Sequence, residues 1–242
     1  MPPPSEAGRE RRSLALAAGP VEYLLVRRRG RRGVGLKVDS AGLTVSAPLS
    51  IPVSRIEKLV AESESWVLGK LAIWRGRQVP AQRWEEGATV PWLGEALALR
   101  LVPARRAGAE QAEGALVVRV AAAGEEAIRR TVVAWYRRAA LAHLAHRAFV
   151  FSRLAGLAPP RVMISSARSR WGSCNSRREV RLSWRLAKAR PALVDYVVCH
   201  ELAHLRHMNH SREFWCEVER LCPDYRVLRE ELESTDHLYR SF

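Results

Sequence analysis

The sequence contains few cysteines and no C-x-x-C pair, so neither a disulfide framework nor a zinc finger is indicated. The cysteines stand singly, at Cys174, Cys199, Cys216 and Cys222. No apolar run approaches the roughly 18 residues that a membrane span requires. The stretch from Ser13 to Val26 follows several arginines but is broken by Pro20 and Glu22, which argues against a signal peptide. These absences predict a cytoplasmic protein with reduced thiols and no membrane partner.

Lysine is also scarce, occurring only at residues 37, 58, 70 and 188, although the formal net charge is +15. Arginine therefore supplies most of the positive charge. A basic surface attracts nucleic acid or phosphorylated substrates, but an arginine- and alanine-rich composition also arises from genome composition alone, and we favour that explanation. The cluster from Arg27 to Arg32 has two similar interpretations, a phosphate-binding patch or a solvated strand end. We favour the solvated strand end.

The chain is long enough for one large domain or two small ones, and its content of 48% hydrophobic and 27% charged residues is that of a globular protein. Residues 1–18 are rich in proline, glutamate and arginine, which predicts a disordered tail. Residues 19–122 are predicted to form a small antiparallel β-rich domain with one helix. Its expected strands include 33–38 and 43–47, and its helix begins at Val53. We recognise no internal repeat in the sequence.

Residues 123–242 form the second predicted domain. Apolar residues at helical spacing predict a long helix from Glu125 to about Leu154. Short strands are expected at 161–165 and 179–184, and Pro191, which suits the first turn of a helix, opens another helix. The pattern of both domains together predicts the α+β class.

The helix that begins at Pro191 contains the motif H-E-x-x-H, formed by His200, Glu201 and His204. Residues i and i+4 lie on one face of a helix, so the two imidazoles point the same way and can hold one zinc ion. Glu201, next to the first ligand, is placed to take a proton from a water molecule that the metal activates. The same motif also occurs by chance on amphipathic helices with solvated histidines, so a third ligand is needed to decide.

His210 is the predicted third ligand, because a catalytic zinc ion has three protein ligands and one open position. The spacing of His200, His204 and His210 is that of H-E-x-x-H-x-x-G-x-x-H, although His207 stands at the glycine position. His207 is therefore the competing candidate. The chain must bend back to bring His210 to the metal, and Asn209 is the predicted pivot because asparagine tolerates the left-handed conformation.

Several further segments accompany the zinc motif in a fixed order. They are Arg170-Trp171-Gly172-Ser173-Cys174, Leu182-Ser183-Trp184-Arg185-Leu186, Asp195-Tyr196-Val197-Val198, Asn209-His210-Ser211, Phe214-Trp215 and Pro223-Asp224-Tyr225. Together they resemble the YgjP-like metallopeptidase family, bacterial relatives of the SprT-like zinc proteases. The resemblance is dense from about residue 160 to 234 and looser from 20 to 120. Ser183 departs from it, since the family pattern has asparagine there.

The resemblance implies a zincin-like α+β catalytic domain, preceded by the small β-rich domain. It also implies zinc ligands at His200, His204 and His210, with Glu201 as the general base. The predicted function is therefore a zinc-dependent hydrolase, first of all a metallopeptidase acting on peptide or protein substrates. The sequence gives no indication of the oligomeric state.

The residue that stabilises the oxyanion and the substrate class both stay open. Arg170, Asn175, His207 and Tyr225 are candidates for the first role, and the sequence does not rank them. One alternative function is the metal-dependent hydrolysis of nucleotide phosphoanhydrides at the same site. Another is a basic nucleic-acid-binding module with structural zinc. A structural zinc ion usually has four protein ligands, which argues against the second alternative.

Overall fold

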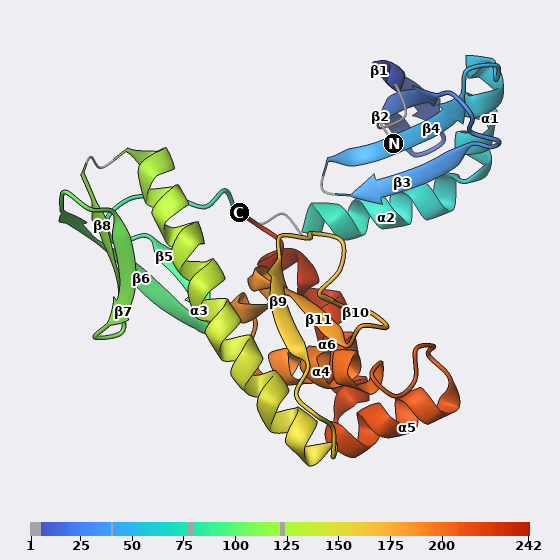
Figure 1. Cartoon of the computed structure of the whole chain (residues 1–242). Helices are drawn as coiled ribbons and strands as arrows, with labels where there is room; N and C mark the ends of the chain where they lie inside the picture. The colour runs from blue at the N-terminus through green and yellow to red at the C-terminus, as the bar shows by residue number, and fades with distance from the viewer. Residues whose placement is uncertain (1–5, 40, 77–79, 122–123) are drawn as a thin grey trace. The chain divides into compact units, whose positions relative to one another are not determined.

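The computed structural model describes residues 6–39, 41–76, 80–121 and 124–242. The chain divides into two compact units, Met1–Pro80 and Ala81–Phe242 (Figure 1), and each unit has its own buried core. No helix within the described ranges combines the length and the apolar character needed to cross a membrane. The predicted domain boundary at residues 122 and 123 lies outside the described residues. The four strands between residues 89 and 120, which the prediction assigned to the first domain, belong to the second unit.

The first unit is a four-stranded sheet followed by two helices. Its strands are β1 (Glu6–Leu16), β2 (Gly19–Arg28), β3 (Gly35–Asp39) and β4 (Gly42–Pro48), in the order β1-β2-β4-β3. The helices are α1 (Val53–Glu62) and α2 (Glu64–Gly76). Alternate side chains of β2 and β4 face inward, as the two-residue period of a strand requires. Tyr23, Leu25 and Val45 pack there with Ile56 and Val60 of α1.

Three features of this unit differ from the sequence-based expectation. The single predicted helix is two helices, α1 and α2, which are separated at Ser63. Residues 6–16 form an edge strand rather than a disordered tail, because pairing with β2 satisfies their backbone hydrogen bonds. The side chains of 8–16 are largely exposed, which explains their polar composition. The sheet is also not wholly antiparallel, since β2 and β4 pair in parallel. Residues 1–5 of the predicted tail lie outside the described residues.

The second unit begins with another four-stranded sheet. Its strands are β5 (Thr89–Trp92), β6 (Glu95–Pro103), β7 (Gly108–Ala112) and β8 (Ala115–Val120), in the order β5-β6-β8-β7. Helix α3 (Glu125–Leu154) follows, with the bounds expected from its apolar spacing. Figure 1 shows α3 running between this sheet and the remaining elements of the unit. Buried residues on both sides of α3 belong to one continuous core.

The two four-stranded sheets have the same topology, a repeat that the sequence did not reveal. In each sheet the first two strands and the last two strands form antiparallel hairpins, and the second and fourth strands pair in parallel. The helix after each sheet has buried residues at the fourth and eighth positions after its N-cap. These are Ile56 and Val60 in α1, and Ile128 and Val132 in α3.

The rest of the second unit carries the H-E-x-x-H motif. Its strands β9 (Arg161–Ser165), β10 (Gly172–Cys174) and β11 (Glu179–Ser183) form a sheet in the order β10-β11-β9, with β10 at an edge. A 3-10 segment, η1 (Trp184–Lys188), leads to the helices α4 (Pro191–Ala203), α5 (Arg212–Leu221) and α6 (Tyr225–Tyr239). This mixture of small sheets and helices agrees with the predicted α+β class.

Candidate metal centre

Helix α4 is held firmly in the core of the second unit. It begins at Pro191, as predicted, where the missing N–H of proline costs no helical hydrogen bond. Its buried apolar side chains include Leu193, Val194, Val197, Val198 and Leu202. An ion pair ties it to α3, because Arg147 Nε and Nη2 donate to the two carboxylate oxygens of Asp195 at 2.6 and 2.8 Å. The ligand candidates therefore project from a fixed support.

The H-E-x-x-H motif lies at the C-terminal end of α4. His200 and Glu201 belong to its last turn, and His204 is the C-cap residue, still in a right-handed helical conformation with φ −64° and ψ −19°. The rings of His200 and His204 meet edge to face, with centroids 5.1 Å apart. His204 Nδ1 lies 3.1 Å from the carbonyl oxygen of His207. Donation from Nδ1–H to that carbonyl leaves the Nε2 lone pair of His204 available for a metal.

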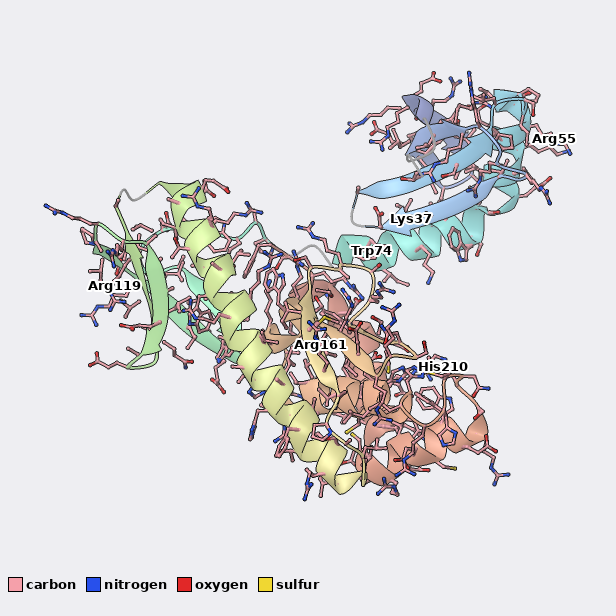
Figure 2. All side chains as sticks on the ribbon, in the orientation of Figure 1. Lys37, Arg55, Trp74, Arg119, Arg161 and His210 are labelled. Carbon is pink, nitrogen blue, oxygen red and sulfur yellow. The ribbon has the colours of Figure 1, made fainter. Side chains whose placement is uncertain are left out.

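His210 returns to the same place from the segment between α4 and α5. The helix ends at Ala203, and a tight turn follows in which the N–H of His207 donates to the carbonyl of Ala203 at 3.0 Å. The predicted left-handed pivot at Asn209 is wrong, since Asn209 has no positive φ. The turn bends the chain earlier, so no left-handed residue is needed. Figure 2 labels the His210 side chain, which lines one cavity together with β10.

The three histidines predicted from spacing come together. One ring nitrogen of each of His200, His204 and His210 lies within 4.8 Å of the others, and His207 does not belong to this group. The Nε2 atoms of His200 and His210 are 3.3 Å apart. The buried ring of Phe214 contacts all three imidazoles, at centroid distances of 4.9, 4.5 and 4.8 Å. Packing against this one apolar ring restricts the orientation of the three imidazoles.

Burial favours the neutral form of the His200 and His204 imidazoles. Burial, with a smaller contribution from His204 and His210, lowers the pKa of His200 to about 3. Burial also lowers the pKa of His204, and the hydrogen bond to the His207 carbonyl opposes that change. A neutral imidazole carries a lone pair, which is the form in which histidine binds a metal.

This donor set fits a zinc ion. Zinc binds imidazole nitrogen at about 2.0–2.1 Å in tetrahedral geometry, which separates two ligand nitrogens by about 3.3–3.4 Å. The 3.3 Å between Nε2 of His200 and Nε2 of His210 agrees with that separation. Within the described part of the chain, the group of potential ligands has three members. Three protein ligands leave one position for water or substrate.

Glu201 lies beside the histidines as a buried carboxylate. Its side chain is buried, and among the described residues its Oε2 has no hydrogen-bond partner. Burial raises the pKa of Glu201 to about 8, against the attraction of Arg170, which lowers it. A buried carboxylate with a free oxygen next to metal ligands is the arrangement expected of a general base.

A cavity of about 310 Å³ adjoins the histidines and Glu201. The other residues that line it are Gly172, Ser173, Cys174 and Met208. Strand β10 therefore forms part of its wall, which the sequence did not indicate. The available signal was Gly172, in a polar segment whose composition is also typical of a loop. In the structure residues 172–174 form the edge strand of a sheet.

None of the four oxyanion candidates, within the described chain, lines this cavity. Asn175 instead closes the hairpin of β10 and β11, since its Oδ1 accepts hydrogen bonds from the backbone N–H groups of Arg177 and Glu179. Tyr225 stacks on Trp215 with centroids 5.4 Å apart and lines a different cavity.

Ser183, the residue that departs from the family pattern, is fully buried. Its Oγ donates to the carbonyl of Ala167 at 3.1 Å. The side chain at this position is therefore not exposed to a substrate.

A comparison with models of protein families points to one family. A family model described as the YgjP-like metallopeptidase domain matches residues 32–235. Among solved structures, the metallopeptidase zymogen of Pyrococcus abyssi abylysin is 21% identical over 41% of this chain and 98% of that chain, with a TM-score of 0.36. No curated protein matches. The family match includes all three clustered histidines, Glu201 and most of the first unit.

Proposed function

The chain belongs to the YgjP-like metallopeptidase family, and we propose that it is a zinc peptidase in which His200, His204 and His210 hold the metal and Glu201 is the general base. The observation that carries the proposal is the convergence of three imidazole nitrogens beside a buried carboxylate with an unpartnered oxygen. The proposal includes a zincin-like catalytic domain and a peptide or protein substrate. A cytoplasmic location stays a prediction from the sequence.

In this proposal the protein supplies the proton transfers and the orientation of the substrate. A zinc ion, when bound, supplies a Lewis acid that lowers the pKa of water from about 15.7 toward 7. Glu201 accepts a proton from the attacking water at Oε2 and returns it to the leaving amine. Burial raises the pKa of the Glu201 carboxyl group, which strengthens it as a base. The edge of β10 suits an extended peptide held by main-chain hydrogen bonds.

Replacing Glu201 by glutamine tests the role of the base. Glutamine keeps the shape of the side chain but cannot take a proton, so Glu201→Gln should retain zinc while kcat falls by about 10²- to 10⁴-fold. Zinc content is measured by atomic absorption, and cleavage of a peptide mixture by mass spectrometry with and without chelator. Wild-type turnover in the variant would remove Glu201 from the mechanism.

Paired histidine variants test the metal ligands. Loss of a direct ligand should weaken zinc binding by more than the roughly 10- to 100-fold seen for outer-shell partners, so His210→Ala should lose zinc to a chromogenic chelator. His207→Ala is the matched control, because it keeps the backbone carbonyl near His204 Nδ1 and removes only a ring outside the cluster. Equal zinc loss in both variants would assign the third ligand elsewhere.

The two alternative functions have less support. The family match concerns peptidases, and the described ligand group has three members, not the four of a usual structural zinc site. The zinc-loaded protein can be offered nucleoside triphosphates, and DNA at several salt concentrations. Phosphoanhydride cleavage, or strongly salt-dependent DNA affinity, in a protein without peptidase activity would replace the proposal.

A further inference from the structure

Strand β10 passes so close to Glu201 that residue 172 has no room for a side chain. A Cβ atom built on Gly172 would lie 2.6 Å from both Cγ and Cδ of Glu201, and closer still to its Oε1. Real Cβ atoms essentially never lie within 3.0 Å of a non-bonded heavy atom from elsewhere in the chain. The φ of Gly172 is not in the left-handed region. The glycine is therefore needed for space and not for backbone conformation.

The strand cannot easily retreat to make that space. Gly172 pairs with Leu182, whose side chain is fully buried. On one side of Gly172, the carbonyl of Trp171 accepts a hydrogen bond from the N–H of Ser183 at 2.8 Å. On the other side, Asn175 closes the hairpin through hydrogen bonds to two backbone N–H groups. The backbone of β10 is held on both sides of the glycine.

Helix α4 is fixed as well. Its backbone is anchored by its buried apolar face and by the ion pair between Arg147 and Asp195. The part of Glu201 that can respond is its side chain beyond Cβ, where rotation needs the least energy. A side chain at residue 172 would therefore turn the carboxylate away from its present position.

We infer that Gly172 is a positioning residue for Glu201: the absence of a side chain at this point of β10 lets the carboxylate lie between the strand and the three histidines. The catalytic consequence rests on the proposed function of Glu201. The packing of the two residues does not depend on it, so the two can be tested separately.

A double-mutant cycle in thermal stability tests the packing. With zinc removed by chelator, Gly172→Ala should lower Tm by roughly 2–10 °C, the cost of overpacking a buried site. In a Glu201→Ala background, which lacks the colliding Cγ, Cδ and Oε1 atoms, the same change should lower Tm by less than about 2 °C. Gly108→Ala in β7 is the control, because a Cβ there meets no atom within 4 Å; its Tm should stay unchanged.

Turnover of the zinc-loaded protein tests the catalytic consequence. Gly172→Ala should keep its full zinc content. Its kcat should fall by up to about 10²-fold, and its KM should stay within about threefold of the wild type. Added to Glu201→Gln, Gly172→Ala should lower kcat no further, because both changes act on the same group. Gly108→Ala should keep wild-type kcat.

Equal Tm losses in both backgrounds would overturn the inference, because the new Cβ would then be meeting something other than Glu201. If Gly172→Ala alone does not fold, the double variant decides, since the inference requires Gly172→Ala/Glu201→Ala to fold. The Tm loss from Gly172→Ala could depend on Glu201 as expected in a protein that has no peptidase activity. That result would overturn the proposed function alone and leave Gly172 as the residue that positions Glu201. If the Tm loss depends on Glu201 but the kcat of Gly172→Ala is unchanged, the catalytic consequence of the contact is overturned.

Discussion

Lys188 is a lysine enclosed by aromatic rings. Its side chain is only 1% exposed, Nζ donates to the carbonyl of Ser241 at 2.6 Å, and Nζ lies 3.2 Å from the centroid of the Phe242 ring. Burial, with smaller contributions from Arg185 and Arg168, lowers the pKa of Lys188 to about 6. The folded protein therefore holds this residue mostly neutral at pH 7.

This burial makes stability depend on pH. The pKa of lysine in an unfolded chain is about 10.4, so between pH 6 and 10 the unfolded state binds one more proton and this group's contribution to the free energy of unfolding rises with pH. Lys188→Met should be most stabilised relative to the wild type at pH 6. That advantage should shrink by about 2 kcal/mol by pH 8, within the limit of about 1.4 kcal/mol per pH unit.

Urea unfolding of both proteins across this pH range measures the difference. The raised pKa of Glu201 acts in the opposite direction over the same range, because the folded state then binds more protons than the unfolded state. Glu201 is common to both proteins, so its effect cancels in the difference. A difference that is constant from pH 6 to 8 would mean that Lys188 is charged in the folded protein.

The residues of the candidate metal site show what spacing alone can predict. His200, Glu201 and His204 follow from the helical period, because residues i and i+4 are neighbours wherever a helix forms. His210 followed from a known spacing, although the turn that delivers it was assigned to Asn209 and lies earlier in the chain. Gly172 could not be predicted, because its role depends on a tertiary contact between β10 and α4.

Among the elements, α3 and α4 are joined by the ion pair of Arg147 and Asp195. The two side chains are 28% and 22% exposed, and both hydrogen bonds of the pair are short. Asp195→Asn keeps the shape of the side chain but removes its charge. The half-buried guanidinium of Arg147 then lacks a negatively charged partner. The free energy of unfolding should fall by about 1–3 kcal/mol.

Unfolding in guanidinium chloride at neutral pH measures this loss of stability, and Glu113→Gln is the control. The pair of Arg100 and Glu113 is 3.6 Å long, and its side chains are 62% and 87% exposed, so its loss should cost less than about 0.5 kcal/mol. Equal costs for the two variants would show that the pair between α3 and α4 does no more than a surface pair.

Elements with strong local signals were predicted well. The apolar spacing gave α3 its bounds, and Pro191 marked the start of α4. Strand β1 was missed because an exposed edge strand has the polar composition of a disordered tail, and only pairing with β2 distinguishes the two. The parallel pairing of β2 and β4 is also non-local, since β3 lies between them in the chain.

At the scale of the whole molecule, the described residues form two separate cores. The core of the second unit contains only residues from Trp84 onward, and the core of the first unit ends with Leu71. A chain starting at Ala81 should therefore fold cooperatively and bind zinc with an affinity within about threefold of the full chain. Circular dichroism during heating and a chelator competition measure the two properties. An unfolded fragment would mean that the second core depends on the first unit.

The repeated strand order has a consequence for how strictly sequence specifies this fold. At equivalent register positions the first sheet has Tyr23 opposite Leu43, and the second has Leu99 opposite Leu116. An aromatic and an aliphatic side chain thus occupy the same site in one architecture. What both copies share is the alternation of buried and exposed residues. Different side chains can therefore encode this β scaffold, whereas the close approach of β10 to Glu201 leaves space only for glycine at residue 172.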